Sequence, residues 1–62
     1  SPCTEKTIEA GSSGVIISYR GCDCRKYDAY VPKGKVFIFC HLDGSVVIGS
    51  GSYTVLSSKV CY

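Results

Sequence analysis

The most regular hydrophobic pattern in the chain is the alternation of apolar and polar side chains along VIISYR, residues 15–20. A period of two predicts a strand with Val15, Ile17 and Tyr19 on one face. The opposite face then carries Ile16, Ser18 and Arg20. A weaker alternation over residues 4–10 predicts another short strand, although its Glu and Lys residues are depleted in strands generally.

The longest apolar run is Val36–Phe39, which is rich in β-branched and aromatic residues. Such a run predicts a strand that is buried on both faces. Asp43-Gly44 follows, and an Asp-Gly pair between two apolar runs predicts a two-residue hairpin turn with positive φ at both positions. The return strand covers residues 45–48. The expected cross-strand pairs are Leu42 with Ser45, His41 with Val46 and Cys40 with Val47.

Turn residues divide the rest of the chain into short segments. Gly11–Gly14, Pro32–Gly34 and Gly49–Ser52 read as turns, and they bound further strands over residues 29–31 and 53–62. No window has a helical period longer than one turn. Six short strands in 62 residues predict a single domain over residues 1–62, an all-β sandwich or small barrel.

Cysteine content changes this picture, because a chain of this length buries only about 60% of its unfolded surface. Five cysteines in 62 residues indicate a disulfide scaffold from an oxidising compartment, so we expect a secreted protein whose export signal has been removed. The C-x-C spacing at Cys22 and Cys24 argues against zinc, and we expect no metal and no other cofactor. The five cysteines are Cys3, Cys22, Cys24, Cys40 and Cys61.

The five cysteines cannot all pair within one chain. Five choices of the unpaired residue, times three pairings of the other four, give fifteen arrangements, and the sequence does not choose among them. A bond between Cys22 and Cys24 would close a strained ring, so at most one of them goes to each distant partner. A bridge from Cys3 to Cys40 would tie the first strand to the hairpin, and a second from Cys22 or Cys24 to Cys61 would tie the last strand to the end of the second. The choice between Cys22 and Cys24 stays open at this point, and the remaining cysteine is expected to be a free thiol or a dimer contact.

Charge and side-chain chemistry exclude several functions. A net charge of +2 is too weak to indicate a nucleic-acid partner, and no segment has the ~20 apolar residues needed for membrane insertion. Five cations lie between positions 20 and 35, which we interpret as a solvated face or, alternatively, as a basic patch for an acidic partner. The single histidine, His41, is expected at a surface-exposed strand end, and Cys40 points to the opposite face. We therefore predict no catalytic residues and no enzyme activity.

Six short strands, with one cysteine at the start of the first and another just before the fifth, resemble the MAX effectors of plant-pathogenic fungi, above all the ToxB-like members. The resemblance rests on cysteine placement and strand order over nearly the full chain. It implies disulfides from Cys3 to Cys40 and from Cys22 to Cys61, which leaves Cys24 as a free thiol. It also implies a disulfide-stabilised, six-stranded antiparallel β-sandwich of two three-stranded sheets, with strands 1, 2 and 6 packed against strands 3, 4 and 5.

The same resemblance implies a secreted, monomeric virulence factor, toxin or avirulence protein, extracellular or taken up into host cells. Its partner would be a host protein, such as a heavy-metal-associated-like domain that pairs with an edge strand, or an immune receptor. From the residues, we predict residues 15–20 as the exposed edge; the alternative is a central strand used wholly inside the fold. The predicted protein-binding residues are Ile16, Ser18, Arg20, Arg25 and Lys26.

Two other functions fit the residues. The first is a small cationic, disulfide-rich antifungal or killer-type toxin, in which the five tyrosines form an aromatic face for glycans or lipid. The second is a protease inhibitor that presents Lys33 in the turn Pro32–Gly34 to a trypsin-like pocket. The five tyrosines are Tyr19, Tyr27, Tyr30, Tyr53 and Tyr62.

Overall fold

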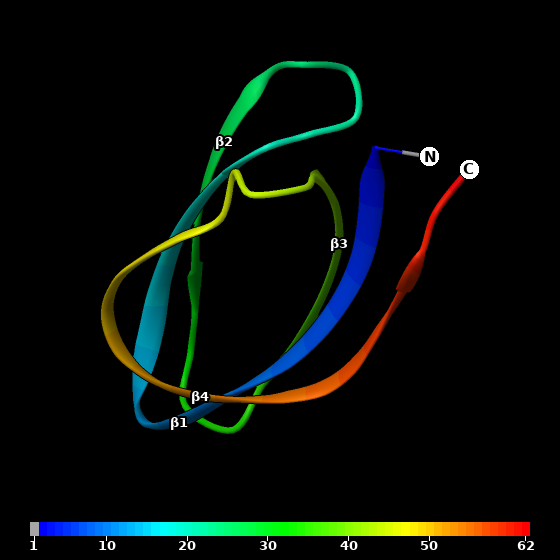
Figure 1. The fold of residues 1–62 in the computed structure, drawn as a ribbon. Coiled ribbons are helices and arrows are strands. Elements are labelled where there is room, and N and C mark those ends of the chain that lie inside the picture. The colour runs from blue at the N-terminus through cyan, green and yellow to red at the C-terminus, as the bar shows by residue number, and fades with distance from the viewer. Residues whose placement is uncertain (1) are drawn as a thin grey trace.

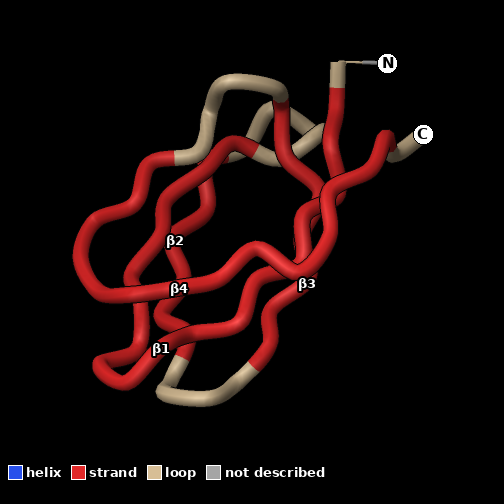
Figure 2. Tube along the Cα trace, turned by 60° about the horizontal axis from the view of Figure 1, so that its bottom comes forward, coloured by secondary structure: helices blue, strands red, loops and turns tan. Residues whose placement is uncertain are grey.

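The computed structural model describes residues 2–62, and strands make up most of them (Figures 1 and 2). All strand pairs are antiparallel, and no helix occurs within the described residues. The prediction of an all-β fold is therefore confirmed. The strands are β1 (Cys3–Arg20), β2 (Lys26–Val31), β3 (Val36–Leu42) and β4 (Val47–Val60).

Strand β1 pairs with each of the other three strands and divides the sheet into two halves. Residues 3–9 of β1 pair with β3, and residues 4–10 pair with the C-terminal part of β4. Residues 15–20 of β1 pair with β2, and residues 15–18 pair with the N-terminal part of β4. We call these the first and the second half-sheet. In each of them β1 is the central strand.

The two half-sheets meet where β1 and β4 bend, and Figure 1 shows both strands curving through the lower part of the molecule. The register between β1 and β4 shifts between Ala10 and Val15, and Gly14 and Gly51 have φ values of 71° and 109° there. A Cβ atom on Gly51 would lie 2.1 Å from the carbonyl oxygen of Gly14. Glycine at position 51 therefore permits both the backbone conformation and the close crossing of the two strands.

The core is formed by side chains from both half-sheets. Ile8 and Ala10 come from one half of β1, while Val15 and Ile17 come from the other half, and all four are buried. The alternation along residues 15–20 is thus confirmed, since Ile16 is exposed between the buried Val15 and Ile17. Val31 of β2 and Phe39 of β3 complete the buried cluster.

The structure has four strands where the sequence predicted six, because two of them are continuous through segments expected to be turns. β1 runs through Gly11–Gly14, and β4 runs through Gly49–Ser52. The implied division into strands 1, 2 and 6 against 3, 4 and 5 differs from the observed pairing. Residues 4–10 and 15–20 take different partners, β3 and β2, instead of lying side by side in one sheet.

The chain turns at Asp43-Gly44 as predicted, but the strands on either side of the turn do not pair with each other as a hairpin. The Ser45 N–H donates to the Leu42 carbonyl oxygen at 3.1 Å, but only Gly44 has positive φ among the turn residues, at 82°. Positive φ at the third position alone is the pattern of a type II turn, which splays the adjoining strands. β3 and β4 therefore leave the turn toward different halves of β1, and the three predicted cross-strand pairs are wrong.

The prediction that Val36–Phe39 is buried on both faces is also wrong. Phe39 is buried, but Val36 is exposed and Ile38 has 61% of its surface accessible. β3 therefore covers the core with alternate side chains only, and its other face is exposed at Val36 and Ile38.

Candidate protein-binding groove

Strands β2 and β3 are joined by a short turn but belong to different half-sheets, so an open groove of about 450 Å³ lies beside them. The turn is held against the bend of β1, because Ala10 donates to the Lys35 carbonyl and Gly34 donates to the Ala10 carbonyl. We call this hollow the β2–β3 groove. Its lining consists of Tyr19, Gly21, Cys22, Asp23, Tyr27, Phe37, Ile38, Phe39 and Cys40.

Packed aromatic rings line the groove. Tyr19 stacks on Tyr27 with 5.4 Å between ring centroids, and it lies 4.6 Å from the ring of Phe39. Phe37 stacks on Phe39 at 5.2 Å. Contacts of this kind add about 0.5–1.5 kcal/mol each beyond area burial. The lining is therefore a preformed apolar surface contributed by β1, β2 and β3.

One end of the groove is ordered by Asp23. The Tyr27 hydroxyl donates to Asp23 Oδ2 at 2.5 Å, and the Arg25 backbone N–H donates to Asp23 Oδ1 at 3.0 Å. The Tyr27 bond, followed by the Arg25 bond, lowers the pKa of Asp23 below its ordinary value. The same bond with Asp23 raises the pKa of Tyr27, and burial raises the pKa of Tyr19. This end therefore carries an ionised carboxylate at neutral pH.

The outer edge of β3 borders the groove. Within residues 2–62, β3 pairs along its length with β1 alone, apart from a single bridge between His41 and Gly21 near its C-terminal end. No charged residue and no proline occurs in Val36–Leu42, and its pairing with β1 contains no bulge. Proteins usually blunt exposed edges with such residues or with bulges. The β3 edge is thus available for pairing with an added strand.

Two exposed cations lie at the β2–β3 turn, next to the start of β3. Lys33 and Lys35 lie in and directly after the β2–β3 turn, and both are exposed. An acidic group near the turn would be attracted, with an effect that weakens as salt increases.

Four of the five predicted binding residues share another surface, the outer face of the second half-sheet. Ile16, Ser18 and Arg20 lie opposite Tyr30, Asp28 and Lys26 of β2. Arg25 lies in the loop before β2. The prediction that residues 15–20 form a free edge is wrong, because this segment is hydrogen-bonded between β2 and β4; the alternative of a central strand is the one observed.

The five tyrosines do not form one aromatic face. Tyr19 and Tyr27 line the groove, whereas Tyr30 lies opposite Ile16 and Tyr53 lies opposite Ala10 on β4. The contribution of Phe37 and Phe39 to the groove was not predicted from the sequence. Their alternate spacing on the run VFIF was the signal that could have placed both rings on one face.

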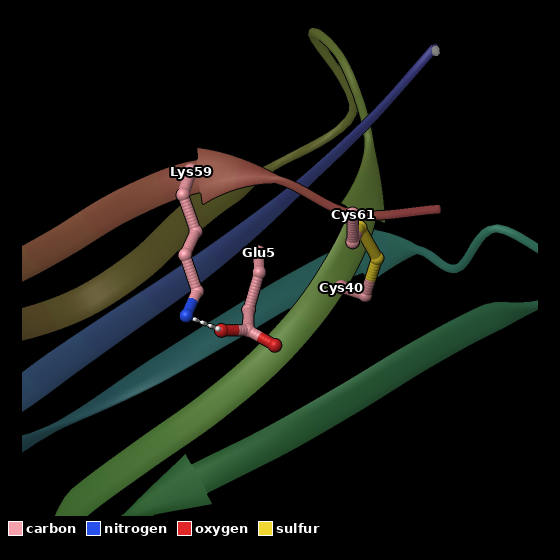
Figure 3. Close-up of polar contacts among 4 residues, drawn as sticks. All are labelled: Glu5, Cys40, Lys59 and Cys61. Atoms are coloured by element: carbon pink, nitrogen blue, oxygen red, sulfur yellow. Dashed lines mark ion pairs between the residues drawn. A yellow bond between two sulfur atoms is a disulfide. The ribbon is translucent and has the colours of Figure 1, made fainter.

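The disulfides join Cys3 to Cys22 and Cys40 to Cys61, and Cys24 is an exposed free cysteine. Figure 3 shows the Cys40–Cys61 bond near the ion pair of Glu5 and Lys59, in which Lys59 Nζ lies 3.5 Å from Glu5 Oε1. The implied bridges Cys3–Cys40 and Cys22–Cys61 are therefore not those of the structure.

The four bonded cysteines are close neighbours regardless of how they pair. Their sulfur atoms all lie within 4.8 Å of one another. Strand order and spacing could not distinguish the pairings, because each of the four sulfurs is near all the others. We call Cys3, Cys22, Cys40 and Cys61 the sulfur cluster.

The prediction that His41 is exposed is wrong, since its residue exposure is 5%. Its ring lies 5.5 Å from that of Phe39, two residues earlier on the same face of β3. Nδ1 is 2.8 Å from the Leu42 carbonyl oxygen, and Nε2 is buried without a hydrogen-bond partner in the described part of the chain. His41 is therefore a core residue.

The part of the chain that the structure describes contains no helix with the length and hydrophobicity needed to span a bilayer. Comparisons with protein-family models, with curated proteins and with solved structures found no match to this chain.

Proposed function

We propose that this chain is a secreted effector without enzymatic activity that binds a host plant protein, as its resemblance to the MAX effectors implies. The observation that carries the proposal is the open edge of β3 beside the aromatic β2–β3 groove. Two disulfides in a chain of 62 residues are compatible with an extracellular location.

The proposed occupant is an extended segment of the partner that adds a strand to β3. Main-chain hydrogen bonds along an edge supply affinity, and pockets for alternate side chains supply specificity. Side chains on one face of the added strand would enter the groove against Tyr19 and Phe39. Side chains on its other face would lie beside Val36 and Ile38, which are both exposed.

The exposed lysines of the β2–β3 turn favour an acidic residue on the partner. Lys33 and Lys35 are exposed at the turn end, so the partner strand is expected to carry an acidic residue there and apolar residues along the groove. This complementarity would increase the association rate more than the affinity, and it would weaken with ionic strength.

A titration of the isotope-labelled chain with a purified plant heavy-metal-associated-like domain tests the proposal by NMR. We expect amide shifts confined to β3, to the groove residues of β2 and to the β2–β3 turn. Shifts centred on β4, or on the outer face around Ile16 and Arg20, would overturn the assignment of the site. The absence of any shift at millimolar domain concentration would remove this class of partner.

A matched pair of variants separates edge pairing from general surface contact. Ile38→Lys and Val47→Lys replace residues of similar exposure, 61% and 62%, on β3 and on β4. A lysine on an edge strand disfavours strand addition, so Ile38→Lys is expected to abolish binding while Val47→Lys retains it. Equal binding by both variants would contradict the proposed site. Circular dichroism of each variant checks that the fold is kept.

A further inference from the structure

The sulfur cluster lies where four separate segments of the chain meet. Cys3 begins β1, Cys22 follows β1, Cys40 lies in β3 and Cys61 follows β4. One of the four residues is buried, two are half-buried and Cys22 is exposed, so the cluster is anchored in the fold and open to solvent on one side.

Backbone contacts hold these segments together independently of the sulfur bonds. The Cys61 N–H donates to the Cys3 carbonyl oxygen at 3.3 Å. Glu5 lies opposite Cys40 in the pairing of β1 with β3. The antiparallel bridge between Gly21 and His41 places Cys22 beside Cys40. In the folded chain these contacts therefore place the four sulfurs near one another without any sulfur–sulfur bond.

The distances between sulfurs of different disulfides are close to those of a tetrathiolate metal site, and reduction frees the two bonded pairs to separate to the same spacing. Zinc binds four thiolates tetrahedrally at about 2.3 Å, which places the sulfurs roughly 3.8 Å from one another. In the structure, Cys22 Sγ lies 3.2 Å from Cys40 Sγ and 4.0 Å from Cys61 Sγ, and all four lie within 4.8 Å. We propose that the sulfur cluster binds one Zn²⁺ ion through four thiolates when both disulfides are reduced.

The chemistry balances with a thiol reductant of the glutathione or dithiol class. Each disulfide accepts two electrons and two protons and becomes two thiols, while two reductant thiols become one disulfide. Zinc then displaces protons from the thiols into solvent as the four Zn–S bonds form. The chain thus has two cross-linked states, one held by disulfides in an oxidising compartment and one held by zinc in a reducing compartment.

The C-x-C spacing in the sequence argued against zinc, and the structure explains why this spacing is not decisive. Cys24 lies outside the cluster, so Cys22 contributes to it without a sequence neighbour. The other three ligands come from distant segments, brought together by strand pairing. Because Cys24 is not a ligand, it provides a cysteine variant that should leave metal binding intact.

Titration of Co²⁺ and then Zn²⁺ into the whole chain, reduced with a phosphine in the absence of oxygen, tests the proposal. Cobalt should bind with a stoichiometry of one and give the intense visible absorption of a tetrahedral tetrathiolate site, and zinc should displace it. The oxidised chain should bind neither ion. Absence of this absorption in the reduced chain would overturn the proposal, as would a spectrum typical of oxygen ligands.

Two variants and a folding measurement complete the test. Cys24→Ser should keep the tetrathiolate spectrum, whereas Cys61→Ser should lose it. Loss in Cys24→Ser, or retention in Cys61→Ser, would place the site elsewhere and refute the ligand set. If the reduced chain unfolds without metal, zinc should restore its β circular dichroism. Binding without recovery of the fold would also refute the proposal, because the site would then not be the one in the structure.

Discussion

Removal of the Cys40–Cys61 disulfide should destabilise the protein by about 3 kcal/mol. The bond closes a loop with a sequence separation of 21, and the chain-entropy model gives about 3.3 kcal/mol for a loop of that length. A domain of 62 residues is stable by roughly 3–9 kcal/mol at the usual 0.05–0.15 kcal/mol per residue. One bond therefore accounts for a large part of the folding free energy.

The suitable variant is Cys40→Ala with Cys61→Ala in a Cys24→Ala background, which prevents the free thiol from entering new disulfides. Urea unfolding, followed by circular dichroism with a chelator present, compares it with Cys24→Ala alone. With a dependence on urea of about 1 kcal/mol per molar, the unfolding midpoint should fall by roughly 3 M. The Cys24→Ala control should remain close to the unmodified chain, since Cys24 is exposed and outside both disulfides.

The result that refutes this reasoning is a midpoint equal to that of the control. It would mean that the loop between Cys40 and Cys61 is already restricted in the unfolded chain, or that the two residues are not bonded. A disulfide map of the unreduced protein by mass spectrometry distinguishes these explanations. The loop from Cys3 to Cys22 has a separation of 19 and does not overlap the other, so removal of both bonds should cost about twice as much.

Two further predictions concern a backbone crossing and a titrating pair. Gly51→Ala should destabilise the fold strongly, because the new Cβ atom would lie 2.1 Å from a backbone oxygen. Gly44 also has positive φ but faces open space, so Gly44→Ala should cost only about 1–2 kcal/mol. Thermal unfolding of both variants measures the difference. Tyr27→Phe should raise the pKa of Asp23 toward its ordinary value, as measured by NMR titration of the carboxyl carbon. Because the pKa of Asp23 is lower in the folded chain than in the unfolded chain, the ionised carboxylate stabilises the fold at pH values above the ordinary carboxyl pKa. This stabilisation is lost as the pH falls through the pKa of Asp23 in the folded chain. Tyr27→Phe should therefore lose less stability in acid than the unmodified chain does. An unchanged Asp23 titration in Tyr27→Phe would show that the Tyr27 hydrogen bond does not control this group.

Local patterns predicted which faces of β1 are buried, because alternation is decided by the neighbouring residues themselves. Val15 and Ile17 are inside and Ile16 is outside, as expected from a period of two. The same rule applied to β3 would have placed Phe39 and His41 together on the core side. The apolar character of the whole run hid that alternation, so Ile38 was expected inside and His41 outside.

Pairing between distant segments could not be predicted in the same way. The Asp43-Gly44 dipeptide located a turn, but the φ of one residue decided that the strands splay instead of pairing. The disulfide partners were equally inaccessible, because the four sulfurs converge within 4.8 Å and local sequence does not distinguish one neighbour from another. The β2–β3 groove also depends on tertiary pairing, since it exists only because β2 and β3 belong to different half-sheets.

The position of β1 constrains when the protein can fold. Every strand pairing among the described residues involves β1, and its pairing with β4 extends to Val60. A ribosome releases β1 before the other three strands and β4 after them. The nascent chain must therefore remain without its complete sheet until β4 has emerged, so one edge of β1 stays unpaired while β2 and β3 are being made.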